Sequence, residues 1–186
     1  MTSANFAVHA DAIIPVSGPE NVLKSHSIVV RQGLIDALMP HAQARALSEI
    51  DHVELPGHVL MPGLVNAHGH AGMTLLRGYA DDMSLASWLN DKIWPLEARW
   101  VSPEFVRDGT DIAAAEMLLS GITTTSDMYF FPDIAAQSLR AAGMRTQLVF
   151  PVMNIETAWA KNAEEYFEKG LALRLSLIHI SEPTRR

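Results

Sequence analysis

The sequence contains no cysteine, and this absence excludes a disulfide-stabilised scaffold, a cysteine-ligated zinc cluster and a cysteine nucleophile. It also lacks any run of lysine and arginine, and its net charge is −7, so we expect no nucleic-acid partner. No stretch of about 18 uncharged apolar residues occurs, so we expect no membrane span. The start of the chain lacks the basic and apolar regions of a secretory signal. Together these absences favour a cytoplasmic protein.

Apolar residues are plentiful, because 48% of the 186 residues are hydrophobic, and this is enough for a substantial core. The first part of the chain, residues 1–57, has alternating and β-branched patterns that are typical of short strands. We expect such strands at 6–16, 27–38 and 52–57, with a hairpin turn at Gln32 and Gly33 and a weak helix at 41–50. Residues 1–57 are therefore predicted to form a small β-rich unit.

From residue 58 onward, strand and helix patterns alternate with short connections, which predicts parallel βα units. Apolar strand patterns lie at 58–68, where Pro62 and Gly63 interrupt the run, and at 122–127 and 145–152. Helical patterns lie at 102–121, 132–143 and 157–173, and a shorter one lies within 84–100. Ser102 is suited to cap the first long helix, and Gly121 is suited to end it. A (β/α)8 barrel needs eight such units, and about three are here, so residues 58–174 are interpreted as the N-terminal part of a truncated barrel.

The last residues, 175–186, read "LSLIHISEPTRR" and are not expected to continue the helical pattern before them. They match the in-frame translation of a transposase adapter that is used to prepare sequencing libraries. We therefore leave this segment, with its His179, out of the functional interpretation.

His68 and His70 follow the apolar strand pattern and are separated only by Gly69. Residues i and i+2 of a strand lie on the same face, and the carboxyl end of a barrel strand is where active sites lie. Two neutral imidazoles there could bind one zinc, iron or nickel ion. The alternative is a pair of polar side chains at a strand end, with no metal.

Three longer stretches carry a resemblance to a known family: "MPGLVNAHGHAGMTLLRGYADD", "WLNDKIWPLEARWVSPE" and "GITTTSDMYFFPDIAAQSLRAAGMRTQLVFPV". They resemble the amidohydrolase superfamily, in its cytosine/adenosine deaminase and s-triazine hydrolase branch, and most closely the 5-methylthioadenosine/S-adenosylhomocysteine deaminases. The similarity covers about residues 6–174. It implies a metal-bearing (β/α)8 barrel of α/β class, preceded by part of a small β-sandwich formed by residues 1–57.

The resemblance also implies a metal site, with His68 and His70 as its two ligands on the first barrel strand. We expect one divalent metal ion, and zinc in particular. In such enzymes the other ligands and the glutamate that shuttles protons come from later strands, which have no counterpart in this chain. We therefore assign no catalytic acid or base here. The family's arginine on the third-strand loop is also missing, because Phe150 and Pro151 occupy that region, so the exact substrate stays open.

Two further residues are candidates for binding substrate. By resemblance, Glu97 corresponds to the glutamate that holds the ribose hydroxyls of a nucleoside; read from the residues alone, it is more readily a solvated carboxylate. Trp88 lies on the loop that would cover the barrel mouth. It could stack on a purine, or it could simply pack against the core.

Two charged residues near the expected site carry simpler predictions. Arg77 is expected either to position its loop or to pair with Asp81 or Asp82; a surface pair is the default, and it would contribute little to stability. Asp127 falls at the carboxyl end of its strand, where it could face the site or cap the next turn.

Together these residues lead to competing hypotheses about function. The first is metal-dependent hydrolytic deamination of an adenine nucleoside, 5-methylthioadenosine or S-adenosylhomocysteine, to the inosyl product and ammonia. The second is other carbon–nitrogen or carbon–chlorine hydrolysis in the same superfamily, as in guanine deaminases or chlorotriazine hydrolases. The third is a non-catalytic metal-binding fragment. We expect the partner to be a small purine nucleoside, the longer parent protein to be able to form a homo-oligomer, and these 186 residues alone to be inactive.

Overall fold

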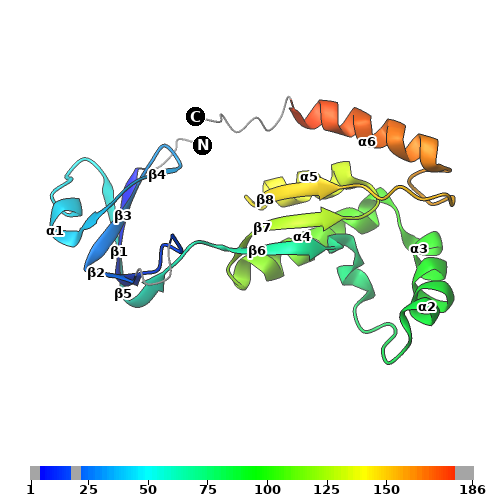
Figure 1. Cartoon of the computed structure of the whole chain (residues 1–186), viewed down its shortest axis with the longest axis horizontal. Coiled ribbons are helices and arrows are strands. Elements are labelled where there is room, and N and C mark those ends of the chain that lie inside the picture. Colours follow the sequence, from blue (N-terminus) through cyan, green and yellow to red (C-terminus); the bar gives the residue numbers. More distant parts are fainter. Residues whose placement is uncertain (1–4, 18–21, 179–186) are drawn as a thin grey trace. The chain divides into compact units, whose positions relative to one another are not determined.

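A computed structural model of the chain describes residues 5–17 and 22–178 (Figure 1). These residues form two compact units that divide between Pro62 and Gly63. The boundary predicted after residue 57 falls inside strand β5 (Asp51–Leu60), five residues before that division. No helix in the described part of the chain is long and apolar enough to cross a membrane.

The N-terminal unit is a five-stranded sheet with one short helix. Strand β1 (Phe6–Ile13) pairs with β2 (Leu23–Lys24) and β3 (His26–Arg31) on one side and lies parallel to β5 on the other. The edge strand β4 (Leu34–Pro40) pairs with β3.

The turn between β3 and β4 confirms the predicted hairpin. Gln32 and Gly33 both have positive φ angles, of 52° and 77°, and such angles suit a tight turn between antiparallel strands. The helix expected at 41–50 is confined to α1 (His41–Ala44). Small and branched side chains fill the core of this unit: Ala7, Val29, Ala44 and Ile50.

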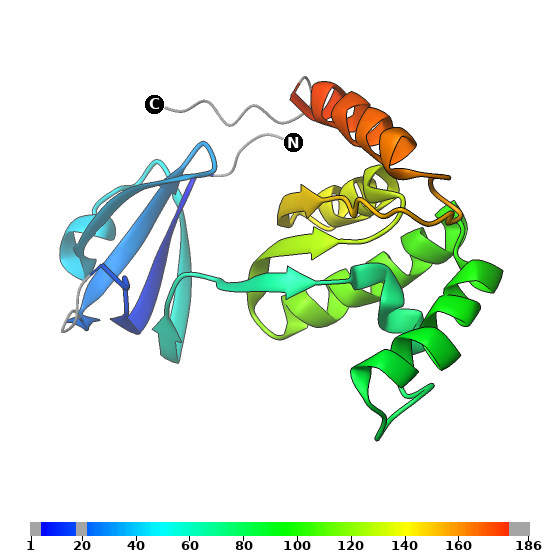
Figure 2. The same cartoon turned by 45° about the vertical axis from the view of Figure 1, so that its right-hand side comes forward.

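The second unit contains three parallel strands in the order β6 (Leu64–Gly69), β7 (Ile122–Met128) and β8 (Arg145–Val149). The interruption expected at Pro62 and Gly63 within the 58–68 run separates β5 from β6. Helices α4 (Pro103–Leu119) and α5 (Pro132–Ala141) cover the same face of this sheet (Figures 1 and 2). This arrangement confirms the α/β class.

The ends of the long helices follow from their capping residues. Ser102 accepts a hydrogen bond from the backbone N–H of Phe105 at 3.1 Å, as expected for the cap of α4. Asn162 does the same for Glu165, at 3.0 Å, so α6 (Ala163–Ile178) begins later than the pattern at 157 suggests. The helix continues through residues 175–178, so the prediction that the helical pattern stops before 175 is wrong there; residues 179–186 lie outside the described ones.

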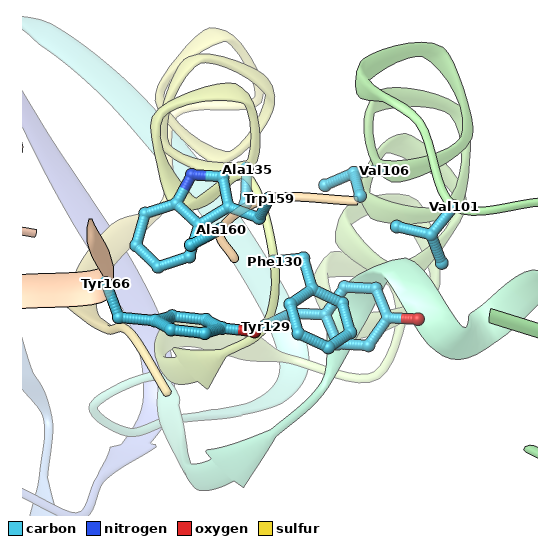
Figure 3. Close-up of a cluster of buried hydrophobic side chains, with 8 residues drawn as sticks. All are labelled: Val101, Val106, Tyr129, Phe130, Ala135, Trp159, Ala160 and Tyr166. Carbon is cyan, nitrogen blue, oxygen red and sulfur yellow. The ribbon is translucent and has the colours of Figure 1, made fainter. Parts of the chain in front are cut away.

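A long connection joins β6 to α4 and carries several short helices. A 3₁₀ helix (Ala71–Leu76) follows β6, and then come α2 (Leu85–Ser87), a π-helical turn (Trp88–Ile93) and α3 (Trp94–Trp100). The main core cluster joins this connection to the strand ends and to α6. Figure 3 shows its aromatic rings gathered with small side chains: Val101, Val106, Tyr129, Phe130, Ala135, Trp159, Ala160 and Tyr166.

Candidate metal and substrate site

The two candidate metal ligands lie at the carboxyl end of β6, at the point where its pairing with β7 becomes irregular. The register shifts between Asn66 and Gly69. Gly69 faces the packed side of this irregularity, because a Cβ atom there would lie 3.2 Å from Asn66 Nδ2 and 3.5 Å from an Asp127 carboxylate oxygen. The imidazoles of His68 and His70 come together, with ring centroids 4.9 Å apart and planes at 86°. The strand end therefore brings the two rings side by side.

A backbone carbonyl from β7 fixes the orientation of His70. The Nδ1–H of His70 donates to the carbonyl oxygen of Met128 at 2.6 Å, because a carbonyl can only accept. Neutral His70 then carries its free lone pair on Nε2. Histidines that bind metals commonly have their other ring nitrogen held in this way, so His70 fits a metal ligand.

Asp127 holds the turn that follows β6. Its carboxylate accepts a hydrogen bond from the backbone N–H of Ala71 at 2.6 Å, and the side chain is only 2% exposed. Burial raises the pKa of Asp127, whereas the Ala71 N–H and the nearby His70 act in the opposite direction. Asp127 therefore caps a turn, which is the turn after β6 rather than the one after its own strand, and it also lines a cavity together with His70.

Glu97 is buried, so its interpretation as a solvated carboxylate is wrong. The side chain is 9% exposed and accepts a hydrogen bond from the hydroxyl of Tyr129 at 2.7 Å. Burial raises the pKa of Glu97, and the Tyr129 hydroxyl and His70 both oppose that rise. The same burial, together with the carboxylate beside it, raises the pKa of Tyr129 above its ordinary value. Glu97 is thus held in place by one defined donor.

Tyr129 is the residue that the sequence analysis missed, and two glycines make room for it. A Cβ atom on Gly72 would come within 2.7 Å of the Tyr129 ring, and one on Gly109 within 2.3 Å of the Gly72 carbonyl oxygen. The connection after β6 therefore passes closely between Tyr129 and α4. The sequence did contain a signal for Tyr129, because this residue follows the carboxyl end of the strand that also carries Asp127, where site residues are expected.

Trp88 and Arg77 make contacts of a different kind. The indole N–H of Trp88 donates to the carbonyl of Ala80 at 3.1 Å, and the ring is half-buried. Arg77 forms two hydrogen bonds with Glu116 on α4, at 2.6 and 2.8 Å, so the expected pair with Asp81 or Asp82 is wrong, and the contact fits the alternative that Arg77 positions its loop. The guanidinium reaches across to α4 because the connection turns back over that helix.

Two small cavities adjoin these residues. One of about 70 Å³ lies beside Glu97, and the tryptophan that lines it is Trp94 rather than Trp88. Its other walls include Val101, Phe130, Met153 and Thr157. A second cavity of about 190 Å³ is lined by His70 and Asp127, together with Asn66, Thr125 and residues of α4. Each cavity therefore borders at least one of the polar side chains described above: Glu97 in the first, and His70 and Asp127 in the second.

Within the described residues there is no group of three or more His, Asp or Glu side chains that could hold a metal ion. His68 and His70 would supply two ligands, and a tetrahedral zinc site uses four. The two imidazoles and the fixed Nδ1 of His70 fit a metal site. Two ligands are fewer than a zinc ion needs, so further ligands would have to complete the site.

Residues 59–182 match the sequence model of the Amidohydrolase family, and this match covers more than half of the chain. The chain belongs to that family. It is 48% identical over 174 residues to the 5-methylthioadenosine/S-adenosylhomocysteine deaminase of Teredinibacter turnerae, covering 93% of this chain and 39% of the relative. It is 44% identical over 126 residues to the 5′-deoxyadenosine deaminase of Methanosarcina mazei, covering 68% of this chain and 28% of the relative.

Solved structures show the same fold. An adenosine deaminase from Xanthomonas campestris with bound zinc superposes with a TM-score of 0.82 at 38% identity, covering 93% of this chain and 40% of that one. An atrazine chlorohydrolase from Arthrobacter aurescens, complexed with zinc, gives a TM-score of 0.81 at 20% identity, covering 96% and 44%. The second likeness concerns the fold alone. The amidohydrolase chain described here spans about two fifths of the length of these proteins.

Proposed function

We propose that this chain forms the first three βα units of a metal-dependent (β/α)8 barrel whose complete protein deaminates an adenine nucleoside. The proposed substrates are 5-methylthioadenosine and S-adenosylhomocysteine, and the products are the inosyl compound and ammonia. The observation that carries this proposal is the His68–His70 pair at one strand end, with His70 fixed through Nδ1 and Glu97 buried nearby. The names of the relatives and the zinc in the adenosine deaminase structure support it.

His68 and His70 would hold the divalent metal ion, which we propose to be zinc. The chemistry supplied by a divalent ion held there would be the activation of a water molecule for attack on the amino-bearing carbon of the purine. The chain's own contribution is to orient the ligands. The Met128 carbonyl keeps Nδ1 of His70 protonated, and the Asp127 carboxylate holds the next residue, so the imidazole keeps one tautomer and one direction.

Glu97 would bind the ribose of the substrate. The Tyr129 hydroxyl uses one carboxylate oxygen of Glu97, at 2.7 Å, and the other oxygen can accept from a sugar hydroxyl. Trp94, Phe130 and Met153 line the cavity beside Glu97 and provide an apolar wall for the nucleoside. We retain Trp88 as a candidate for stacking on the purine when a substrate is bound.

The metal site can be tested on the chain itself by calorimetric titration with zinc. We expect wild type to bind zinc, His68→Ala and His70→Ala each to weaken binding by about tenfold or more, and His58→Ala to leave it unchanged. His58 is the matched control because it lies in the other unit and bonds locally to the Pro56 carbonyl. Equal zinc binding by all four proteins would refute the assignment.

The reaction requires the rest of the barrel. We would join residues 1–174 to the remaining part of the Teredinibacter turnerae relative and measure ammonia release in the presence of zinc. We expect turnover of 5-methylthioadenosine or S-adenosylhomocysteine and none by the 186-residue chain alone. Turnover of guanine or a chlorotriazine in place of the adenine nucleosides would favour the alternative hydrolase activities, and turnover by the chain alone would refute its expected inactivity.

A further inference from the structure

The N-terminal unit contains a second group of histidines, which belongs to no part of the site described above. His9 on β1, His41 at the start of α1 and His52 on β5 come together around the hydroxyl of Ser27 on β3. The His9 ring lies 5.5 Å from that of His41 and is stacked on that of His52 at 5.2 Å. Ser27 and His9 are buried, at 0% and 3% exposed, whereas His41 is half-buried and His52 is exposed. The group therefore connects two accessible imidazoles through two buried polar side chains.

The hydrogen bonds in this group must run in one direction when all three rings are neutral. His52 Nε2 lies 3.0 Å from the Leu47 carbonyl, which can only accept, so Nε2 carries the hydrogen and Nδ1 is an acceptor. His9 Nε2 then donates to His52 Nδ1 at 2.9 Å, which leaves His9 Nδ1 to accept from the Ser27 hydroxyl at 2.7 Å. Finally, His41 Nδ1 donates to the same hydroxyl oxygen at 2.8 Å.

One extra proton can be accommodated in either of two ways. A proton on Nε2 of His41 leaves every hydrogen bond as it is. A proton on Nδ1 of His52 reverses the whole series: His9 changes tautomer, and Ser27 turns its hydrogen toward His41, whose own proton moves to Nε2. In both states every hydrogen bond among His52, His9, Ser27 and His41 joins a donor to an acceptor.

Two extra protons cannot be accommodated. With both His41 and His52 charged, His9 Nδ1 and His41 Nδ1 would both donate to Ser27, and the hydroxyl hydrogen would lose both of its partners within the group. Leaving a buried donor without a partner is unfavourable, and Ser27 is fully buried. Because of this shared hydroxyl, protonation at one end opposes protonation at the other, although the two ends lie on different elements.

Burial has the largest effect on the pKa of the buried ring, and the charged groups around it act in both directions. Burial lowers the pKa of His9, and Arg45 on α1 acts in the same direction, while Glu54 on β5 opposes it. Arg45 and Glu54 form an ion pair at 2.8 Å, so their opposite charges largely offset each other. At the other end, the charge of His52 acts on Glu49, which is itself paired with Arg31.

We propose that His41, Ser27, His9 and His52 form a two-ended proton switch that takes up one proton, at either end, and resists a second. Each state has its own hydrogen-bond direction, and His9 reports that direction by its tautomer. The switch belongs to the N-terminal unit alone and does not depend on the metal or on the proposed reaction.

Long-range ¹H–¹⁵N spectra of the labelled 186-residue chain, recorded between about pH 8 and pH 5, test this proposal because they distinguish histidine tautomers and charge. At pH 8 we expect His41 to carry its hydrogen on Nδ1 and His9 on Nε2. On acidification we expect His9 to stay neutral. We expect the first extra proton to enter at His41 or His52, and the second to enter the other of these two residues only at about tenfold higher proton concentration. In Ser27→Ala the two midpoints should move together.

His26 and His58 are internal references in the same spectra. Each bonds to a carbonyl two residues away, so both should titrate alike in wild type and in Ser27→Ala. If Ser27→Ala does not fold, His41→Gln serves instead, because glutamine can still donate to Ser27 but cannot be charged, and His52 should then titrate in one step. A hydrogen on Nε2 of His41 at pH 8, or midpoints that neither variant changes, would overturn the proposal.

Discussion

Replacement of Tyr129 by phenylalanine removes the only hydroxyl that the structure places on Glu97 among the described residues, and leaves the ring that packs over Gly72. Glu97 is 9% exposed and Tyr129 is 5% exposed, so the hydrogen bond between them is buried. A buried hydrogen bond to a charged group contributes about 1.5–3 kcal/mol, so we expect Tyr129→Phe to lower the free energy of unfolding of the second unit by about 2 kcal/mol.

The pH dependence of this loss separates a lost hydrogen bond from a general packing defect. Burial already raises the pKa of Glu97, and removing the hydroxyl raises it further. A carboxyl group whose pKa is higher in the folded than in the unfolded state loses stabilising effect as the pH rises through the folded pKa. The cost of Tyr129→Phe should therefore be larger at about pH 7.5 than at about pH 4.5.

Urea unfolding at both pH values, followed by the fluorescence of the tryptophans, measures this cost. All four tryptophans lie in the second unit. Tyr79→Phe is the matched control, because Tyr79 is 54% exposed, and we expect a change within about 0.5 kcal/mol. A cost for Tyr129→Phe within that same range, or an equal cost at both pH values, would refute the reasoning.

Three other substitutions test the surroundings of the site. Gly109→Ala should lower the free energy of unfolding by about 1–3 kcal/mol, because its Cβ would meet the backbone of Gly72; thermal unfolding that matches wild type would contradict the close approach. Arg77→Gln should leave stability close to that of wild type, since the pair of Arg77 with Glu116 is exposed, and a clear shift of the urea unfolding midpoint would contradict this. Burial raises the pKa of Asp127, so the folded state loses stability as the pH rises and this carboxyl group ionises. Asp127→Asn removes the ionisation and should therefore reduce the fall in the free energy of unfolding between about pH 4 and pH 7. The same pH profile in wild type and variant would contradict this.

Local features of the fold were predictable from the sequence because their causes are local. Gln32 and Gly33 mark the hairpin through their positive φ angles, and Ser102 begins α4 because its side chain bonds three residues ahead. The close approach of His68 and His70 follows from their spacing on a strand, although the irregular pairing around Gly69 could not be foreseen.

The partners of the charged side chains were not predictable, because each lies far away in the sequence. Arg77 contacts Glu116 rather than the aspartates close to it in the sequence, and Glu97 contacts Tyr129, which lies 32 positions further along the chain. Those contacts depend on the connection between β6 and α4 folding back over the strand ends. A pattern of hydrophobic residues predicts the strands but carries no information on that path.

Three successive residues, the last two of β7 and the one that follows it, each hold a different neighbour. Asp127 holds the turn after β6, the Met128 carbonyl sets the tautomer of His70, and the Tyr129 hydroxyl holds Glu97. A single inserted or deleted residue in this strand would disturb all three at once. For protein engineering, the proposed metal ligand and the proposed ribose contact therefore cannot be redesigned independently at the end of β7, and changes of the proposed substrate preference are better sought in the cavity wall around Trp94 and Met153.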